Sequence, residues 1–322
     1  MPRYLETRPH PWTLQDIKNA TMQNFRDVQP SIDQTEGGKI WNSLKELDDT
    51  VWIFSTSAAE LIDEICVFGE RSKATDFWET TNEKNAELYV REVKRKLYYC
   101  TSAVMTLVDI ARNFSKRWPV DGLQDKRIEI FSTPGLHEFL QGLRNFSTHW
   151  RIAQASWQID YDLQTRVRTA HFIIGKEELL AWEGWAAKAK EYIHQSGDRI
   201  DLLKTLTQYK KNVQQYYSWH KGAVLDQHAS SLQRFFEYKR MHAGLLQYMK
   251  WNMILSHATS NLNPYQYLAQ HLTNSQIELV LSHQHRSEQQ VDALIKLIDL
   301  HEICDENMKS KLMKVFSATQ TE

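Results

Sequence analysis

Arg144, Asn145 and His149 are the residues of this sequence whose types and spacing are most suited to chemistry. An arginine carries a fixed positive charge that can hold a phosphate, and an imidazole can give or take a proton near neutral pH. An amide next to them can orient either group through a hydrogen bond. Together, such side chains can bind a phosphodiester and move a proton beside it. We therefore take these three residues as candidate catalytic residues.

The spacing between Arg144 and His149 is not rare in itself. In a chain with this many arginines and histidines, roughly one arginine is expected to have a histidine five positions later by chance. A second pair, Arg166 and His171, does occur, but it lies in a predicted strand, where positions five apart face opposite sides. We interpret the second pair as coincidence, so the first pair depends on its position in the fold.

A helix over residues 134–150 is expected to position the candidate residues. Thr133 precedes Pro134, and a threonine cap followed by proline at the first helical position is a frequent helix start. With about 100° between successive residues, the apolar side chains of this helix form a single stripe, consisting of Leu136, Phe139, Leu140, Leu143, Phe146 and Trp150.

The polar residues of the same helix fall outside the apolar stripe. Asn145 and His149 are four positions apart, so they are neighbours on one face, and the amide could orient the imidazole. The long side chain of Arg144 can reach the same place, with Thr148 beside it. This position argues against a core histidine. The remaining alternative is a solvated polar face without function.

A second candidate surface consists of three cations, Arg91, Lys94 and Arg95, which are followed by two tyrosines. Basic side chains bind phosphates, and aromatic rings can stack on bases. We include these cations, together with Thr148, as candidate nucleic-acid contacts. The alternative is a solvated helix face. Because the net charge of the chain is only −1, any nucleic acid must bind to a local basic patch or to one made by an oligomer.

Metal and cofactor sites are not predicted. His283 and His285 lie close together, but no cysteine pair or HExxH spacing accompanies them. Three scattered cysteines indicate a reducing compartment. We recognise neither a signal peptide nor an apolar stretch of the length that spans a bilayer. The expectation is a cytoplasmic protein without membrane contact.

Long helices are the expected framework, because the chain has only 11 glycines and 7 prolines in 322 residues. We expect a helix over residues 13–33, a break at Gly37 and Gly38, and amphipathic helices over 39–69 and 76–118.

The second half of the chain begins with a change of period. Alternating apolar residues predict two strands within residues 157–174, and a helix is expected over 177–194. A long helical element over 198–257 has apolar residues at heptad spacing and is expected to bend near Gly222 or Gly244. Shorter helices are expected over the remainder, at 265–271, 275–300 and 307–316.

Residues 143–149 resemble the signature of HEPN domains, in which an arginine, a polar residue and further variable residues precede a histidine. The similarity covers roughly residues 76–228, because the motif, a pair of strands and a long helix follow one another in the order found in bacterial HEPN-like proteins. HEPN domains are helical bundles that usually dimerise and bring two copies of the motif together across a cleft. Many are metal-independent endoribonucleases of toxin–antitoxin or antiviral systems.

The resemblance implies a role for each residue of the motif. His149 would activate the ribose 2′-hydroxyl or protonate the leaving oxygen, and Arg144 would stabilise the charge on the phosphate. Asn145 would orient His149 or contact the RNA. The matching region is longer than a typical HEPN domain, and the strand pair is not part of the minimal bundle. Some HEPN domains have lost catalysis and act as scaffolds.

We therefore expect a mainly α protein: a HEPN-like helical bundle with an inserted two-stranded hairpin and a long C-terminal helical extension. The expected segments are residues 1–75, 76–228 with the hairpin at 157–174, and 229–322. The expected function is a homodimeric, metal-independent endoribonuclease acting on RNA, as a toxin or antiviral effector, with a possible antitoxin or regulatory partner. The alternatives are a non-catalytic HEPN-like scaffold and a nucleotide- or DNA-binding regulator.

Overall fold

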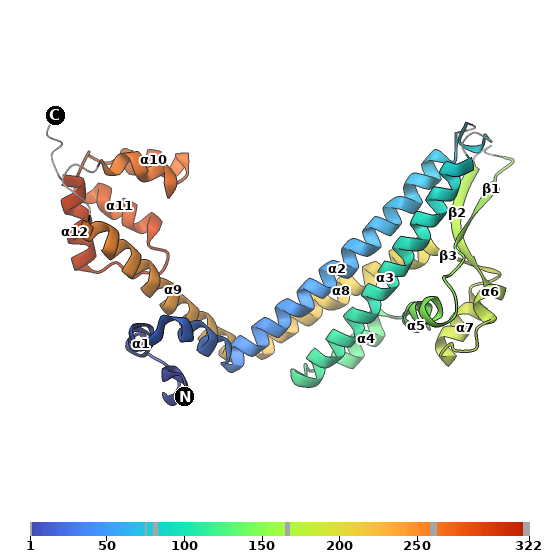
Figure 1. The fold of residues 1–322 in the computed structure, drawn as a ribbon, viewed down its shortest axis with the longest axis horizontal. Coiled ribbons are helices and arrows are strands. Elements are labelled where there is room, and N and C mark those ends of the chain that lie inside the picture. The colour runs from blue at the N-terminus through green and yellow to red at the C-terminus, as the bar shows by residue number, and fades with distance from the viewer. Residues whose placement is uncertain (1, 75, 80–82, 165–167, 258–262, 318–322) are drawn as a thin grey trace. The chain divides into compact units, whose positions relative to one another are not determined.

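The protein is mainly α-helical, as predicted. The structure, a computed structural model, describes residues 2–74, 76–79, 83–164, 168–257 and 263–317. Figure 1 shows long helices and one small sheet. None of the described helices carries the continuous apolar stretch that a bilayer span requires.

The chain divides into two compact units. Met1–Lys39 and Ser230–Glu322 form the first, and Ile40–Ala229 form the second. The division differs from the three expected segments. Residues 1–39 belong to the first unit together with residues 230–322, and residues 40–75 belong to the second.

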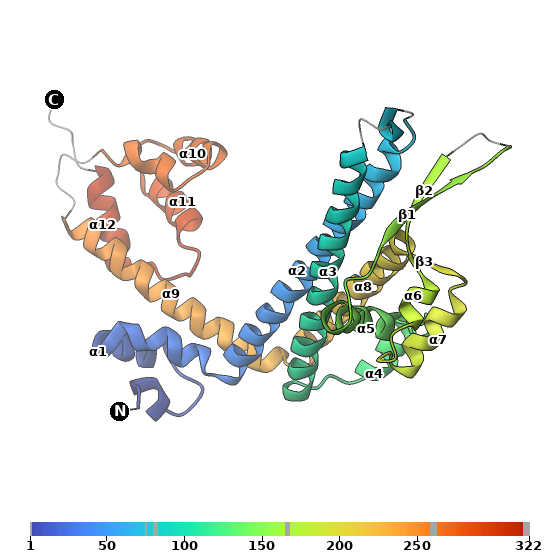
Figure 2. The same cartoon turned by 45° about the vertical axis from the view of Figure 1, so that its right-hand side comes forward.

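The second unit holds the candidate site and consists of helices with a small sheet along one side (Figure 2). Its elements are most of α2 (Glu36–Arg71), η2 (Asp76–Trp78), α3 (Glu83–Arg117), α4 (Leu123–Ile130), α5 (Leu136–His149), β1 (Ser156–Tyr161), β2 (Arg168–Gly175), α6 (Lys176–Leu180), α7 (Ala187–Gln195), β3 (Arg199–Asp201) and α8 (Leu202–Gln227).

Helix α5 contacts α3, α7 and α8 of this unit. Its apolar stripe is buried as predicted, at Leu136, Phe139, Leu140, Leu143 and Phe146. Trp150 is an exception, because it lies just beyond the last residue of α5 and its side chain is 55% exposed. The predicted seam of α8 is buried at Leu202, Leu206, Tyr209, Val213, Tyr216 and His220.

The sheet confirms the predicted hairpin and adds one strand to it. β1 and β2 are antiparallel, with Ser156 opposite Ile173 and Tyr161 opposite Arg168. β3 pairs antiparallel with the other edge of β2, with Ile173 opposite Asp201. This third strand has three residues, which is too few for an alternating pattern to be recognised.

The first unit combines both ends of the chain. Its elements are η1 (Tyr4–Thr7), α1 (Leu14–Asp33), α9 (Ala229–His257), η4 (Pro264–Gln270), α10 (Asn274–Leu281), α11 (Glu288–Ile298) and α12 (Glu306–Ser317). The hydroxyl of the buried Tyr238 in α9 accepts a hydrogen bond from the backbone N–H of Trp12 at 3.0 Å. This bond joins the segment before α1 to α9.

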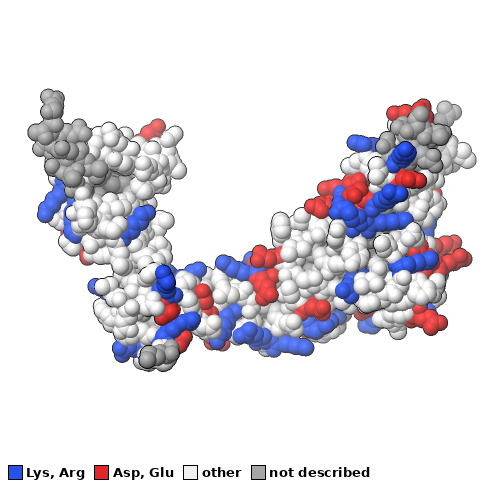
Figure 3. Space-filling view, viewed as in Figure 1, with Lys and Arg blue, Asp and Glu red and all other residues white. Residues whose placement is uncertain are grey.

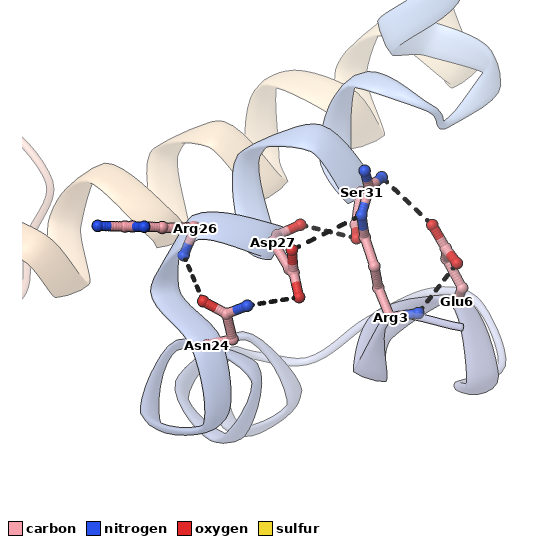
Figure 4. A network of polar contacts seen from close by, with 6 residues as sticks. All are labelled: Arg3, Glu6, Asn24, Arg26, Asp27 and Ser31. Atoms are coloured by element: carbon pink, nitrogen blue, oxygen red, sulfur yellow. Dashed lines mark hydrogen bonds and ion pairs between the residues drawn. The ribbon is translucent and has the colours of Figure 1, made fainter. Parts of the chain in front are cut away.

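A polar network also fixes η1 against α1 (Figure 4). The Arg3 guanidinium contacts both Glu6 (3.4 Å) and Asp27 (3.8 Å). The Asn24 amide donates to Asp27 at 2.8 Å. Asn24 has a non-helical backbone inside α1 (φ −157°, ψ 97°), so the network holds the helix where it kinks.

The expected break at Gly37 and Gly38 is wrong, because α2 already begins at Glu36. A Cβ atom on Gly37 would lie 2.1 Å from the backbone oxygen of Ser231 and 2.8 Å from the Cβ of Phe235. This glycine permits a close approach between α2 and α9. A pair of glycines that looks like a helix breaker is therefore a packing feature.

The start of α5 also differs from the prediction, because Gly135 and not Thr133 precedes its first residue. Gly135 has a φ of 74°, and a Cβ atom there would lie 2.2 Å from the backbone oxygen of Lys188. The Leu136 N–H bonds to the Thr133 carbonyl in a turn at 3.4 Å. Thr133 and Pro134 therefore lie before the helix.

Two other predicted helices are each divided into two in the structure. Residues 177–194 form α6 and α7, because Trp185 between them is buried and its indole N–H donates to the Leu179 carbonyl at 2.6 Å. Residues 275–300 form α10 and α11, where the buried Gln290 amide donates to the Val280 carbonyl at 3.2 Å. In both cases a side-chain donor occupies a backbone carbonyl that the next helical turn would otherwise use.

The long element at 198–257 consists of β3, α8 and α9. Its interruption is at His228, between α8 and α9, and not at Gly222 or Gly244, which both lie inside helices. Beyond His228 the buried side chains Leu232 and Phe235 belong to the first unit. The interruption therefore marks the change from one core to the other.

Candidate functional site

The motif lies on the C-terminal half of α5, on its polar side. Arg144 and Asn145 are half-buried, whereas Thr148 and His149 are exposed. Phe146, between them in sequence, is fully buried. The buried apolar stripe therefore anchors the helix, and the motif lies on the opposite, polar side, as the stripe predicts. His149 is the last residue of α5.

The amide of Asn145 pairs with Arg144 rather than with His149. Its oxygen accepts a hydrogen bond from the Arg144 guanidinium at 3.3 Å. The Thr148 hydroxyl donates to the backbone carbonyl of Arg144 at 2.9 Å. The first of these bonds positions the guanidinium, and neither of them uses the exposed imidazole. Chemically, the arrangement offers a held cation for a phosphate and, at the end of the same helix, a group that can exchange protons with solvent or substrate.

The segment after the motif is tied to the two neighbouring helices. Glu178 of α6 accepts a hydrogen bond from the Gln154 backbone N–H at 2.8 Å and lies 3.8 Å from the Arg151 guanidinium. The Gln154 side chain accepts from the Lys94 ammonium at 2.7 Å. Lys94 of α3 is thus the cation of the predicted basic surface that reaches the chain next to the motif.

The other two cations of that surface face carboxylates. Arg91 lies 3.9 Å from Glu87, and Arg95 lies 2.7 Å from Glu92, each on α3. The hydrogen bond with Glu92 raises the pKa of Arg95. Figure 3 shows the same mixture, with basic and acidic side chains interleaved along α2 and α3. The structure therefore does not bring Arg91, Lys94 and Arg95 together as one unpaired basic patch.

Exposed apolar side chains flank the motif. Trp150 is 55% exposed and Ile152 is 52% exposed, immediately after His149. The prediction placed Trp150 in the apolar stripe, but the helix ends before it. The two side chains add apolar surface beside the imidazole that a folded monomer leaves open to solvent.

A cluster of one histidine with charged side chains on the sheet was not predicted from the sequence. His171 of β2 lies 3.0 Å from Asp201 and 3.6 Å from Asp160, and Arg199 lies 3.2 Å from the same Asp160. Asp201 also caps α8 by accepting from the Lys204 backbone N–H at 3.0 Å. Arg166, the other member of the chance pair, lies outside the described residues. The cluster forms only because β2 pairs with both β1 and β3.

Metal-binding groups are not assembled in the part of the chain that the structure describes. There, no three or more side chains of His, Cys, Asp and Glu are placed to hold an ion. His285 stacks on the ring of Tyr265, with centroids 4.6 Å apart.

Comparison of the chain with protein-family models, with curated proteins and with solved structures finds no match in any of the three. The assignment of a function therefore depends on the motif, its place on α5 and the elements around it.

Proposed function

We propose that the second unit is a HEPN-like, metal-independent endoribonuclease whose half-site consists of Arg144, Asn145 and His149. The observation that carries this proposal is the geometry on α5: Asn145 holds the Arg144 guanidinium at 3.3 Å, and His149 is exposed on the same helix. A histidine buried against its own subunit would favour a structural role instead.

In the proposed reaction, one imidazole takes the proton of a ribose 2′-hydroxyl. The 2′-oxygen attacks the adjacent phosphorus, and the bond to the 5′-oxygen of the next nucleotide breaks. The products are a 2′,3′-cyclic phosphate and a 5′-hydroxyl, which receives its proton from a second imidazole. Arg144 stabilises the extra negative charge on the phosphate in the transition state.

This reaction needs a proton acceptor and a proton donor at the same time, and one His149 cannot be both. A second copy of the chain supplies the other imidazole. The exposed Trp150 and Ile152 next to His149 provide apolar surface for that contact. A homodimer also doubles the local positive charge that meets the RNA backbone. A role as a toxin or antiviral effector follows from the HEPN resemblance.

A non-catalytic interaction module is the second candidate. It is favoured by one observation: Arg91 and Arg95 both face glutamates, so two of the three cations of the predicted basic surface are paired with carboxylates. In this case Trp150 and Ile152 would form a contact surface for a protein partner, and Arg144 and His149 would serve no chemical step.

The two candidates are separated by an RNA cleavage assay in EDTA. We expect wild type to cleave a mixed-sequence single-stranded RNA and His149→Ala and Arg144→Ala each to lose about 10²–10⁴-fold in rate. The matched control is His194→Ala, which removes another exposed histidine of the same unit, on α7, and should cleave as wild type does.

Sedimentation of each variant reports folding and dimer formation independently of cleavage. Folded variants with undiminished cleavage would reject the endoribonuclease. A wild-type dimer that cleaves no RNA would favour the interaction module.

A further inference from the structure

A cleft of about 360 Å³ lies within the second unit, apart from the motif. It is lined by side chains of α3, α4, α5 and α8, including Arg112, Lys116, Arg127, His137 and His220. Figures 1 and 2 both place these four helices side by side. Arg144, Asn145 and His149 are not among the lining residues, so the cleft is separate from the proposed half-site.

Polar groups are built into the inner part of the cleft. His137 Nδ1 lies 2.9 Å from the hydroxyl of Tyr209, and its Nε2 lies 2.7 Å from the amide nitrogen of Gln141. Because the amide nitrogen can only donate, Nε2 accepts, and Nδ1–H donates to the tyrosine oxygen. Burial, with a contribution from the nearby Arg127, lowers the pKa of His137 to about 4, so this network is neutral at physiological pH.

His220 is the least satisfied polar group of the cleft. It is 1% exposed, and within the described residues neither of its ring nitrogens has a hydrogen-bond partner. It packs against the rings of Phe114 (5.4 Å between centroids) and Tyr216 (6.1 Å). Buried polar groups in proteins are nearly always hydrogen-bonded, so two unmade bonds on one cleft-lining imidazole point to a ligand.

Positive charge gathers at the same cleft. Arg112 is paired with Asp109 at 3.2 Å, but neither Lys116 nor Arg127 has a carboxylate partner in the described part of the chain. The lining includes one acid, Glu138, which lies 3.9 Å from Lys188. The cleft therefore has an excess of unpaired cations that can hold an anion.

Aromatic rings form one wall of the cleft. Tyr216 contacts Tyr217 with centroids 5.0 Å apart and Phe131 with centroids 5.7 Å apart. Flat rings of this kind pack against a planar aromatic group. A volume of 360 Å³ is at the lower end of the range of about 300–1,000 Å³ for small-molecule sites, which fits one small ligand and not a polymer.

We propose that this cleft binds a small planar aromatic anion, with its ring against Tyr216 and Phe131 and its charged group between Lys116 and Arg127. His220 provides a hydrogen bond from the cleft wall. The charged group is a phosphate or a carboxylate, which share this chemistry. This site is independent of the endoribonuclease activity, because it uses none of the residues of the motif.

Isothermal titration calorimetry of the full chain tests the proposal with three probes: 1-naphthyl phosphate, 1-naphthoate and the neutral 1-naphthalenemethanol. We expect one binding site per chain, with an anionic probe binding at least about tenfold more tightly than the alcohol. Tighter binding of the phosphate identifies a phosphorylated ligand, and tighter binding of the carboxylate identifies an aromatic acid. Equal affinity of all three probes, or no saturation up to about 1 mM, would overturn the proposal.

Variants locate the site. Lys116→Ala and Arg127→Ala remove exposed cations, so both proteins should fold, and each should weaken the anionic probe about tenfold or more. His220→Leu should also weaken binding of the anionic probe. It should raise the free energy of unfolding, because it removes two unsatisfied nitrogens.

Arg117→Ala is the matched control, because Arg117 follows Lys116 on α3 but does not line the cleft. Arg144→Ala separates this site from the motif. Both variants should bind like wild type. Binding that persists in Lys116→Ala and Arg127→Ala would refute the site, whatever the outcome of the RNA cleavage assay.

Discussion

Acid should destabilise the second unit because it contains two histidines that are kept neutral by burial. Burial lowers the pKa of both His137 and His220 from 6.5 to about 4. Arg127 and Arg112 face His137 and lower its pKa further, whereas Glu138 opposes them. In the unfolded chain both imidazoles regain ordinary values and take up protons first. Stability is therefore complete above about pH 6.5 and is lost as the pH falls toward 4.

The magnitude follows from the two pKa values. At about 1.36 kcal/mol for each tenfold change in affinity for the proton, each histidine accounts for at most roughly 3 kcal/mol. By pH 5, about 2 kcal/mol of this has been lost, because the folded imidazole is still neutral there while the unfolded one is protonated. Together the two histidines should lower the free energy of unfolding by about 4 kcal/mol between pH 8 and pH 5, a large share of a typical total.

Urea unfolding followed by circular dichroism at pH 8 and pH 5 measures this loss. Carboxylates also contribute to the wild-type pH dependence, so the informative quantity is the difference between wild type and His220→Leu. The variant should lose about 2 kcal/mol less than wild type between the two pH values. His194→Leu, on an exposed histidine, should lose as much as wild type. If His220→Leu and wild type lose the same amount, the burial of His220 does not hold its pKa down, and the reasoning fails.

Two further predictions concern the first unit and α2. Gly37→Ala should destabilise the protein by about 1–3 kcal/mol, because its Cβ would meet the backbone oxygen of Ser231 at 2.1 Å. Gly69→Ala, in the same helix with open space around it, should instead stabilise by up to about 1 kcal/mol. Thermal unfolding of the pair checks this, and equal shifts would contradict the packing of α2 on α9. Tyr238→Phe should cost about 1–3 kcal/mol in urea unfolding, because the backbone N–H of Trp12 is left without its acceptor. Full stability of this variant would show that the bond is unimportant.

The local pattern of apolar residues was enough to predict most of the helices and the exposed face of the motif. The stripe of α5 is buried where steps of three and four placed it, and it ends only at Trp150. Periodicity describes which face of a helix is buried, but not the residue at which the helix stops. The predicted end of α5 is therefore wrong at Trp150, although the predicted apolar stripe is correct.

Several of the features that periodicity missed depend on partners that are distant in sequence. His137 and Tyr209 are 72 positions apart, and neither carries a local signal of the pairing. The close approach of Gly37 to Ser231 is of the same kind. The amide of Asn145 was expected to orient His149 from the four-residue spacing, but the neighbouring guanidinium is the partner it has. The spacing of residues along a helix predicts which side chains lie close together. It does not determine which of the nearby partners forms the hydrogen bond.

The composition of the first unit from two separate stretches of chain has a consequence for biosynthesis. Residues 1–39 leave the ribosome well before residues 230–322, with the 190 residues of Ile40–Ala229 in between. At about 5–20 residues per second, this interval lasts roughly 10–40 s. During that time the apolar side chains of α1 lack α9, the helix that carries Tyr238. The nascent α1 is therefore a natural client for a ribosome-associated chaperone, whereas the intervening unit can complete its core as soon as it has been synthesised.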